Sequence, residues 1–387
     1  MKRKWIVLML ACAAVLSPRV GLAQTPYTIT DLGKLGGESS WGGALNNLGQ
    51  VLVRVSGASG ETVYFVWDAA TGARNLSSLV GDEYDVYDLN DGGEFLLRTY
   101  AGTEDRAFLW DGAGQSQYLG AFIPTCITNG PQVLGHVWTG APHALVWDSA
   151  AGVRDIGSLP GGWWASGYAI NNLGQVAGGA NTSLQATGHP ISHSMIDISV
   201  QHHAFLWDEA AGMADLGTLG GDFCWASALN DSGQVVGTSY TGSGREYRAF
   251  LWDEAGGMRD LGTLPGHDWS QAIAINNRGQ VIGRSGRFGS APGDACFLWD
   301  SVNGMHAIED LLLGGSGWSY FDARDINDAG QIAGAGVTVT WVYDPVMHMD
   351  LPRSEAWALV LTPIPEPAGL AILVLGAAAA FFRRRAT

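Results

Sequence analysis

Basic residues are scarce in this sequence. Lys and Arg together number 21, against 37 Asp and Glu, and the formal net charge is −16. Several of the basic residues lie close to the two chain ends, so the chain between them is more acidic still. Because an acidic surface repels phosphate backbones, we expect no nucleic acid among the partners.

Cysteine is also rare, and the usual catalytic and metal-binding motifs are missing. Cys126, Cys224 and Cys296 lie far apart without Cys-x-x-Cys spacing, which is typical of small buried apolar residues. The sequence contains no Gly-x-Ser-x-Gly elbow, no phosphate-binding loop, no His-Glu-x-x-His and no Asp-x-Asp-x-Asp calcium loop. We expect no metal and no cofactor.

Glycine and tryptophan, in contrast, are abundant, and they occur in repeats. Residues 248–264 read RAFLWDEAGGMRDLGTL. Residues 203–219 repeat this stretch almost letter for letter, and residues 143–159 repeat it more loosely. Self-similarity of this kind indicates a repeat fold.

Each repeat contains four apolar runs of strand length, separated by turn residues. In the clearest repeat the runs span residues 225–230, 234–240, 248–252 and 258–264. Runs such as 249–252 are apolar throughout, which is typical of strands packed on both faces of their sheet.

The first turn of the repeat occurs seven times, and most spacings lie in the forties. The copies are at residues 46–50, 90–93, 129–132, 171–175, 230–234, 276–280 and 327–331. A four-stranded unit of this period is typical of a β-propeller blade. We therefore predict an all-β fold, a β-propeller of seven four-stranded blades, over residues 24–363.

The seventh repeat lacks its fourth run. Its runs at 321–326, 331–337 and 356–361 are followed by Pro363. Residues 27–35, YTITDLGKL, match the missing run and have no repeat of their own. We predict that they complete the last blade, because closure removes the sheet edges that would otherwise promote aggregation.

The repeat resembles a known family. His203-Ala-Phe-Leu-Trp-Asp, followed by Gly212-Met213 and by Asp215-Leu-Gly-Thr-Leu219, is similar to the HAF family of bacterial extracellular repeat proteins. The resemblance covers nearly the whole chain between the terminal segments, closely in repeats four to six and loosely in the first three. It implies export and repetition, and no particular activity.

The N-terminus has the layout of a secretory signal. Basic residues at 2–4 precede an apolar run at 5–16, and Gly21-Leu22-Ala23 provides a small-x-small site. We predict a signal peptide at residues 1–23 that is cleaved after Ala23.

The C-terminal segment, residues 364–387, resembles a sorting signal. Pro365-Glu366-Pro367 precedes an apolar run at 368–382, and Arg383, Arg384 and Arg385 follow. This order is similar to the PEP-CTERM signal read by exosortases in Gram-negative bacteria. The resemblance implies a transient association with the inner membrane, processing by an exosortase-type enzyme and display at the cell surface. The alternative is a single-span anchor, although fifteen apolar residues are fewer than the roughly 20 that span a bilayer.

Five tryptophans are the candidate ligand-binding residues. Each precedes the first turn of its repeat by an odd number of residues, so in extended segments they would point to one side. They are Trp41, Trp164, Trp225, Trp269 and Trp318. As a ring at the channel mouth, opposite the first turns, they would stack on sugar rings or on other flat apolar faces. The alternative is that they fill the core between blades.

Four aspartates end the third runs, namely Asp148, Asp208, Asp253 and Asp300. We expect them to cap the following turns by Asx hydrogen bonds rather than to bind calcium.

No catalytic residue is identified. The leading hypothesis is an exported, surface-displayed repeat protein that acts as a non-enzymatic binding or structural module of the cell envelope or extracellular matrix, with polysaccharide as the candidate ligand. The alternative is a propeller glycan hydrolase or lyase, because propeller enzymes gather carboxylates from distant blades into the channel.

Overall fold

A computed structural model describes residues 25–365, except 82, 103, 138–142, 183–200, 243–245, 290–293, 314–316 and 345–348. The predicted cleavage site Ala23 and the sorting residues Glu366, Pro367, Arg383, Arg384 and Arg385 lie outside these residues. Within the described part of the chain, no helix has the length and apolar character needed to span a membrane.

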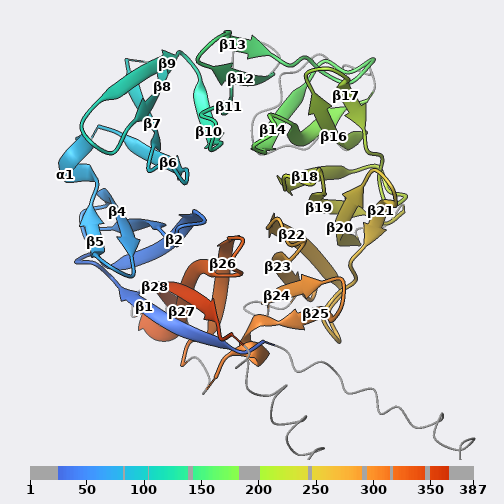
Figure 1. Cartoon of the computed structure of the whole chain (residues 1–387). Helices are drawn as coiled ribbons and strands as arrows, with labels where there is room; N and C mark the ends of the chain where they lie inside the picture. The colour runs from blue at the N-terminus through green and yellow to red at the C-terminus, as the bar shows by residue number, and fades with distance from the viewer. Residues whose placement is uncertain are drawn as a thin grey trace, which may run out of the picture. The chain divides into compact units, whose positions relative to one another are not determined.

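Residues Tyr27–Ile364 form a seven-bladed β-propeller, in which seven four-stranded antiparallel sheets are arranged in a ring (Figure 1). The prediction of the fold and of the number of blades is confirmed. The strands of blades 1 to 3 are β2 (Ser39–Leu45), β3 (Val51–Ser56), β4 (Thr62–Asp68), β5 (Gly72–Asn75), β6 (Asp85–Leu89), β7 (Phe95–Ala101), β8 (Glu104–Trp110), β9 (Ser116–Gly120), β10 (Ile123–Ile127), β11 (Val133–His136), β12 (Ala144–Asp148) and β13 (Gly152–Asp155).

Blades 4 to 6 follow the same order, with the first strand innermost and the fourth outermost. Their strands are β14 (Ala165–Ile170), β15 (Val176–Asn181), β16 (His202–Asp208), β17 (Gly212–Asp215), β18 (Cys224–Leu229), β19 (Val235–Tyr240), β20 (Tyr247–Asp253), β21 (Gly257–Asp260), β22 (Trp269–Ile275), β23 (Val281–Gly286), β24 (Ala295–Asp300) and β25 (Gly304–Ala307). The helical turns α1 (Ser77–Val80) and η1 (Ile308–Leu311) follow the fourth strands of blades 1 and 6.

The last blade combines both ends of the propeller chain. It contains β26 (Tyr320–Ile326), β27 (Ile332–Asp344), β28 (Met349–Pro363) and β1 (Tyr27–Gly33), with β1 antiparallel to β28 at the outer edge. The predicted closure is confirmed. The β27–β28 hairpin is longer than predicted, because β-branched and aromatic residues at 338–343 favour continued pairing.

The first turn of each repeat joins the two inner strands of a blade. In blade 1 the Asn46 N–H donates to the Gln50 carbonyl at 3.1 Å, and Gly49 adopts a φ of 78°, which suits glycine. In blade 3 the corresponding bond runs from Thr128 to Gln132 at 3.0 Å. The first turn of the third repeat therefore begins at Thr128, one residue before the predicted start at Asn129.

The repeated motif fastens the outer strands to each other. The His203 ring contacts the Asp215 carboxylate at 2.8 Å, and His143 contacts Asp155 at the same distance in blade 3. Asp215 also accepts the Gly217 N–H at 2.8 Å, which shapes the turn that leaves the fourth strand. This histidine and aspartate therefore have a structural role.

The motif phenylalanine is the centre of the packing in blades 4 to 6. Phe205, Phe250 and Phe297 are fully buried. Phe250 packs against Gly237 of the second strand, where an added Cβ would lie 2.1 Å from a backbone carbonyl and 2.9 Å from the phenylalanine ring. Glycine recurs in the second strand because no side chain fits there.

A serine ties the fourth strand to the next blade. The Ser270 hydroxyl donates to the Gly262 carbonyl at 2.5 Å and accepts the Ala249 N–H at 2.9 Å. Ser40 makes the same two bonds at the closure, donating to Gly33 at 2.6 Å and accepting from Ala358 at 2.7 Å. The N-terminal strand is therefore held by the same contact as an ordinary fourth strand.

Ser40→Ala is expected to lower the free energy of unfolding by about 2 kcal/mol, because two buried backbone groups lose their partner. Urea unfolding followed by tryptophan fluorescence measures the change. Ser116→Ala, at an exposed position of β9, is the control and should leave stability unchanged. Equal stability of both variants would show that the seryl contact contributes nothing to closure.

Candidate functional site

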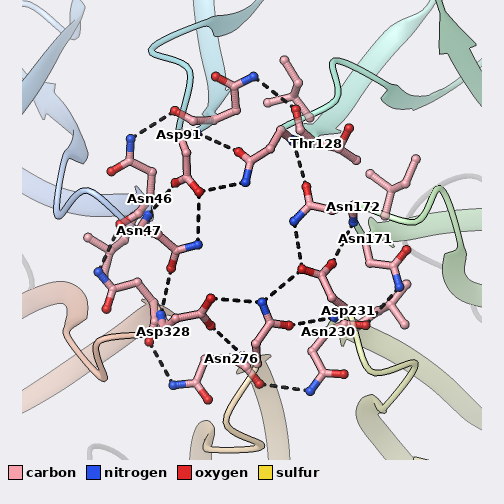
Figure 2. A pocket seen from close by; sticks show the side chains of 18 of the residues that line it. Asn46, Asn47, Asp91, Thr128, Asn171, Asn172, Asn230, Asp231, Asn276 and Asp328 are labelled. Atoms are coloured by element: carbon pink, nitrogen blue, oxygen red, sulfur yellow. Dashed lines mark hydrogen bonds between the residues drawn. The ribbon is translucent and has the colours of Figure 1, made fainter.

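The seven first turns meet around the channel axis and form two rings of polar side chains (Figure 2). The first residue of each turn contributes to a buried ring, which consists of Asn46, Asn90, Thr128, Asn171, Asn230, Asn276 and Asn327. The second residue contributes to a surface ring, which consists of Asn47, Asp91, Asn129, Asn172, Asp231, Asn277 and Asp328. Together with the leucine or isoleucine before each turn, the rings line a cavity of about 190 Å³.

The buried ring is a ladder of amides between neighbouring blades. Each asparagine donates its Nδ2 to the backbone carbonyl of the corresponding residue in the next blade, at 2.9–3.1 Å. Blade 3 is the exception, because Thr128 has no amide to donate to Asn171. The Thr128 hydroxyl only accepts the Gln132 N–H of its own turn, at 3.0 Å.

The surface ring connects all seven blades through the main chain. The backbone N–H of each member donates to the side-chain oxygen of the next member at 2.7–2.9 Å, from Asn47 around to Asp328 and back to Asn47. The asparagine amides then donate to the three carboxylates. Asp91 accepts from Asn47 at 3.2 Å and from Asn129 at 2.8 Å. The ring thus uses its polar groups to join the blades.

Two further carboxylates lie on the inner strands, two residues before the turns of blades 2 and 7. The Asp88 carboxylate accepts the N–H groups of Leu89 at 2.8 Å and of Ile127, in the next blade, at 2.9 Å. Asp325 accepts from Ile326 and from Leu45 of blade 1, both at 2.8 Å. Both aspartates therefore bridge a blade interface.

Burial raises the pKa of both carboxyl groups. The pKa of Asp88 is raised from the ordinary 3.8 to about 7, chiefly by desolvation and in small part by the negative charge of Asp325. Desolvation likewise raises the pKa of Asp325 to about 6. The sequence signal for these groups was weak, because the same position is alanine in four repeats and Cys126 in another.

The five predicted tryptophans lie near the opposite ends of the inner strands from the turns, as the register of β18 and β19 shows. Trp269 is buried, and the other four are partly buried. Trp41 packs against the apolar cluster of Ala335, Val337 and Ala356, and Trp318 stacks on Trp357 with ring centroids 5.4 Å apart. The remaining three, Trp164, Trp225 and Trp269, join one aromatic cluster.

This cluster forms an aromatic rim over blades 4 to 6. Its members, each in ring contact with at least one other, are Trp164, His202, Phe223, Trp225, Tyr240, Tyr247, Trp269 and Phe288. Tyr240 and Tyr247 stack at 5.9 Å, and Tyr247 contacts Trp269 at 5.3 Å and Phe288 at 6.0 Å. The sequence pattern identified these tryptophans, but it did not identify the aromatic residues that contact them in the structure.

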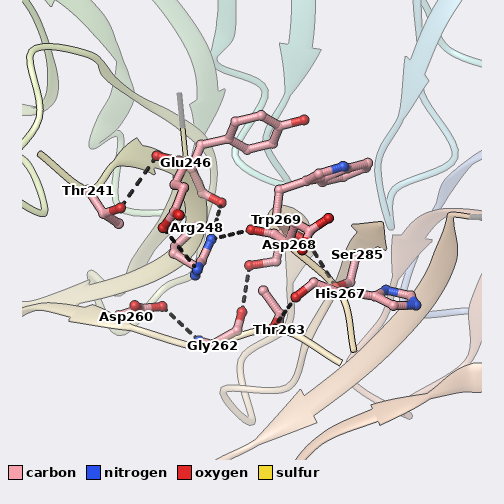
Figure 3. A network of polar contacts seen from close by, with 12 residues as sticks. Thr241, Glu246, Arg248, Asp260, Gly262, Thr263, His267, Asp268, Trp269 and Ser285 are labelled. Carbon is pink, nitrogen blue, oxygen red and sulfur yellow. Dashed lines mark hydrogen bonds and ion pairs between the residues drawn. The ribbon is translucent and has the colours of Figure 1, made fainter. Parts of the chain in front are cut away.

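Polar groups border the aromatic rim in blades 5 and 6 (Figure 3). Arg248 donates to the Asp268 carbonyl at 2.6 Å and pairs with Glu246 at 3.5 Å. The Asp268 carboxylate accepts the Phe288 N–H at 3.1 Å and so orients the loop that carries this ring.

The four aspartates at the ends of the third strands cap turns, as predicted. Asp148 accepts the N–H of Ala150 at 2.9 Å, and Asp300 accepts that of Val302 at 2.8 Å. Among the residues that the structure describes, no group of three or more His, Cys, Asp or Glu side chains is arranged to hold a metal ion.

Comparison with known proteins supports the fold alone. No protein-family model matches the chain, and no curated protein matches it. An acylaminoacyl peptidase from Pyrococcus horikoshii is similar in structure, with a TM-score of 0.52 at 10% identity over 89% of this chain and 55% of that one. The chain thus spans about half the length of that peptidase.

Two other structures give lower scores. TolB from Acinetobacter baumannii has a TM-score of 0.41 at 13% identity, over 79% of this chain and 76% of that one. A gluconolactonase from Xanthomonas campestris has a TM-score of 0.39 at 12% identity, over 87% and 89%. The class of protein established here is a seven-bladed β-propeller.

Thr128→Asn is expected to raise the free energy of unfolding by about 1 kcal/mol, because the new amide reaches the Asn171 carbonyl and completes the buried ring. The isosteric Asn276→Asp, which replaces a donor with an acceptor, is expected to lower it by about 1–3 kcal/mol. Urea unfolding of the two variants tests the ladder in both directions. Two variants as stable as the wild type would refute its contribution.

Stability is expected to fall as pH rises from about 4 to about 8. The folded chain holds protons on Asp88 and Asp325 with pKa values of about 7 and about 6, above the ordinary 3.8 of the unfolded chain. Their contribution is therefore complete below the unfolded pKa and is lost as pH passes through the folded values. Urea unfolding across this range measures the slope, and the double variant Asp88→Asn/Asp325→Asn should flatten it.

Proposed function

We propose that this propeller is an exported, surface-displayed and non-enzymatic binding module that holds polysaccharide in the cell envelope or extracellular matrix. The signal layout of residues 1–23, the PEP-CTERM-like segment at 364–387 and the resemblance of the repeats to the HAF family support export. An exosortase-type enzyme would process the tail after its transient association with the inner membrane.

The positions of the chain ends carry this proposal. Tyr27 pairs with Pro363, and both residues lie close to Gly330 in the first turn of blade 7. Both ends of the propeller chain therefore leave on the same side as the two polar rings. A tail joined to Pro363 is thus attached on the ring side. The aromatic rim lies at the other ends of the inner strands and stays away from the attachment point.

The chemistry of the two sides favours binding over catalysis. The side chains of the surface ring and the two inner aspartates accept backbone N–H groups of neighbouring blades, so their primary contacts are structural. The aromatic rim instead presents rings with partly exposed surfaces, which suit the apolar faces of sugars. The polar groups of the ring side are engaged between blades, and the aromatic side would contact the ligand.

A glycan hydrolase or lyase is the second candidate. Asp88 has a pKa near neutrality, as a general acid requires, and Asp325 provides a second carboxylate on the inner strand of blade 7. Release of reducing ends from a polysaccharide by the wild type, lost in Asp88→Asn, would support this activity. No release from any polysaccharide tested would eliminate it.

Isothermal titration of the purified propeller, residues 24–363, against polysaccharide fractions from the host is expected to show saturable heat. Surface labelling of cells that carry the full chain should detect the propeller outside, and removal of residues 364–387 should release it to the medium. Absence of heat with every fraction would contradict the binding role. Retention of the truncated chain on cells would contradict the role of the tail.

A further inference from the structure

We infer that the aromatic rim of blades 5 and 6 binds a polysaccharide whose sugars carry free amino groups. This inference rests on the proposed function and adds the location of the site and the chemical class of the ligand. Four members of the rim, Phe223, Tyr240, Tyr247 and Phe288, would contact the sugars, and we call them the platform.

The four rings form a continuous row of ring contacts, with interplanar angles of 39°, 27° and 78°. Phe223 contacts Tyr240 at 5.6 Å, Tyr240 stacks on Tyr247 at 5.9 Å, and Tyr247 meets Phe288 at 6.0 Å. Phe288 is 51% exposed, and the other three residues are partly exposed. The exposed parts of these rings suit apolar contacts with successive sugars of one chain.

Three carboxylates lie close to this platform. Asp222 precedes Phe223, Glu246 precedes Tyr247, and Glu246 is 64% exposed. Asp294 lies close enough to Tyr247 for its charge to help raise the pKa of the phenol, after desolvation. A uronic-acid polymer would therefore meet like charge, whereas an ammonium group would meet both carboxylates and aromatic faces.

Blade 7 contains an internal example of the same recognition. The Lys34 ammonium lies 4.7 Å from the centroid of the Trp357 ring and 2.7 Å from the Glu355 carboxylate. Glu355 precedes Ala358 by three residues, as Glu246 precedes Ala249, so the two glutamates are equivalent in the repeat. Blade 5 has the carboxylate, Arg248 at the position of Trp357, and aromatic rings at Tyr240 and Tyr247.

The sequence provides no further ammonium for blade 5. After residue 4 the chain has one lysine, Lys34, which belongs to blade 7. Arg248 pairs with Glu246 at 3.5 Å and donates to the Asp268 and Tyr247 carbonyls at 2.6 and 3.2 Å, and Arg287 precedes Phe288. An amino group of the ligand would be a second cation beside Glu246, whose side chain is 64% exposed.

Three glucose-based polymers of matched length test the inference by isothermal titration with the propeller, residues 24–363. They are a partly N-deacetylated N-acetylglucosamine polymer, its fully N-acetylated counterpart and a polyuronate. At a pH where the amines are protonated, the deacetylated polymer is expected to bind most tightly, and added salt should weaken its binding. The polyuronate should not bind.

Tyr247→Ala and Phe288→Ala are each expected to weaken this binding about tenfold by removing a stacking and cation–π surface. Glu246→Gln should weaken binding of the deacetylated polymer and leave the acetylated polymer unaffected. Tyr118→Ala, at an exposed position in blade 2, is the matched control and should bind normally. Phe288 is a loop residue, so its variant keeps the test valid if Tyr247→Ala does not fold.

The outcomes separate this inference from the proposed function. Equal binding of the acetylated and deacetylated polymers would overturn the amino-sugar specificity, and normal binding by both aromatic variants would overturn the location. In either case the binding role itself would stand. Failure of the wild type to bind any polysaccharide, including the host fractions, would overturn both.

Discussion

The hydrogen bonds between successive first turns are the interaction on which the rest of this structure depends. A four-stranded blade cannot bury both of its faces alone, so it is stable only between two neighbours. The surface ring supplies one backbone-to-side-chain bond at each of the seven interfaces, and the buried ring adds an amide bond at six of them. These bonds set the spacing of the inner strands and therefore the shape of the channel.

The ring also explains how the two sides of the propeller differ. On the turn side, short loops and shared hydrogen bonds place the same residue types in nearly every blade. On the other side the repeats diverge, so that aromatic residues gather in blades 4 to 6 while blade 7 carries a long hairpin. Variation is tolerated there because no contact has to be repeated seven times, and a binding surface can be built there without weakening the ring.

The number of blades and the order of their strands were predictable because the strands and turns of each blade are consecutive in the sequence. Glycine at the turns, the apolar runs and the unmatched segment at Tyr27 were enough to predict seven blades and the closure between the chain ends. The site was less predictable. The asparagines served as markers of the repeat, but their bonds connect residues about 40 or more positions apart, and the position of Asp88 is an aspartate in only one other repeat. The two-residue period of strands predicted that the tryptophans lie on one rim. It could not predict which aromatic rings contact them.

The sequence by itself determined the blade count, the strand order and the closing strand, because hydrogen bonding within a blade depends on runs and turns that lie next to each other in the chain. Only the tertiary structure decided which side chains meet across blades. It brought seven turns to one axis, raised the pKa of Asp88 by enclosing it, and gathered Phe223, Tyr240, Tyr247 and Phe288 into one surface. The physical reason is that neighbours across a blade interface are fixed by closure of the ring, which no single repeat specifies.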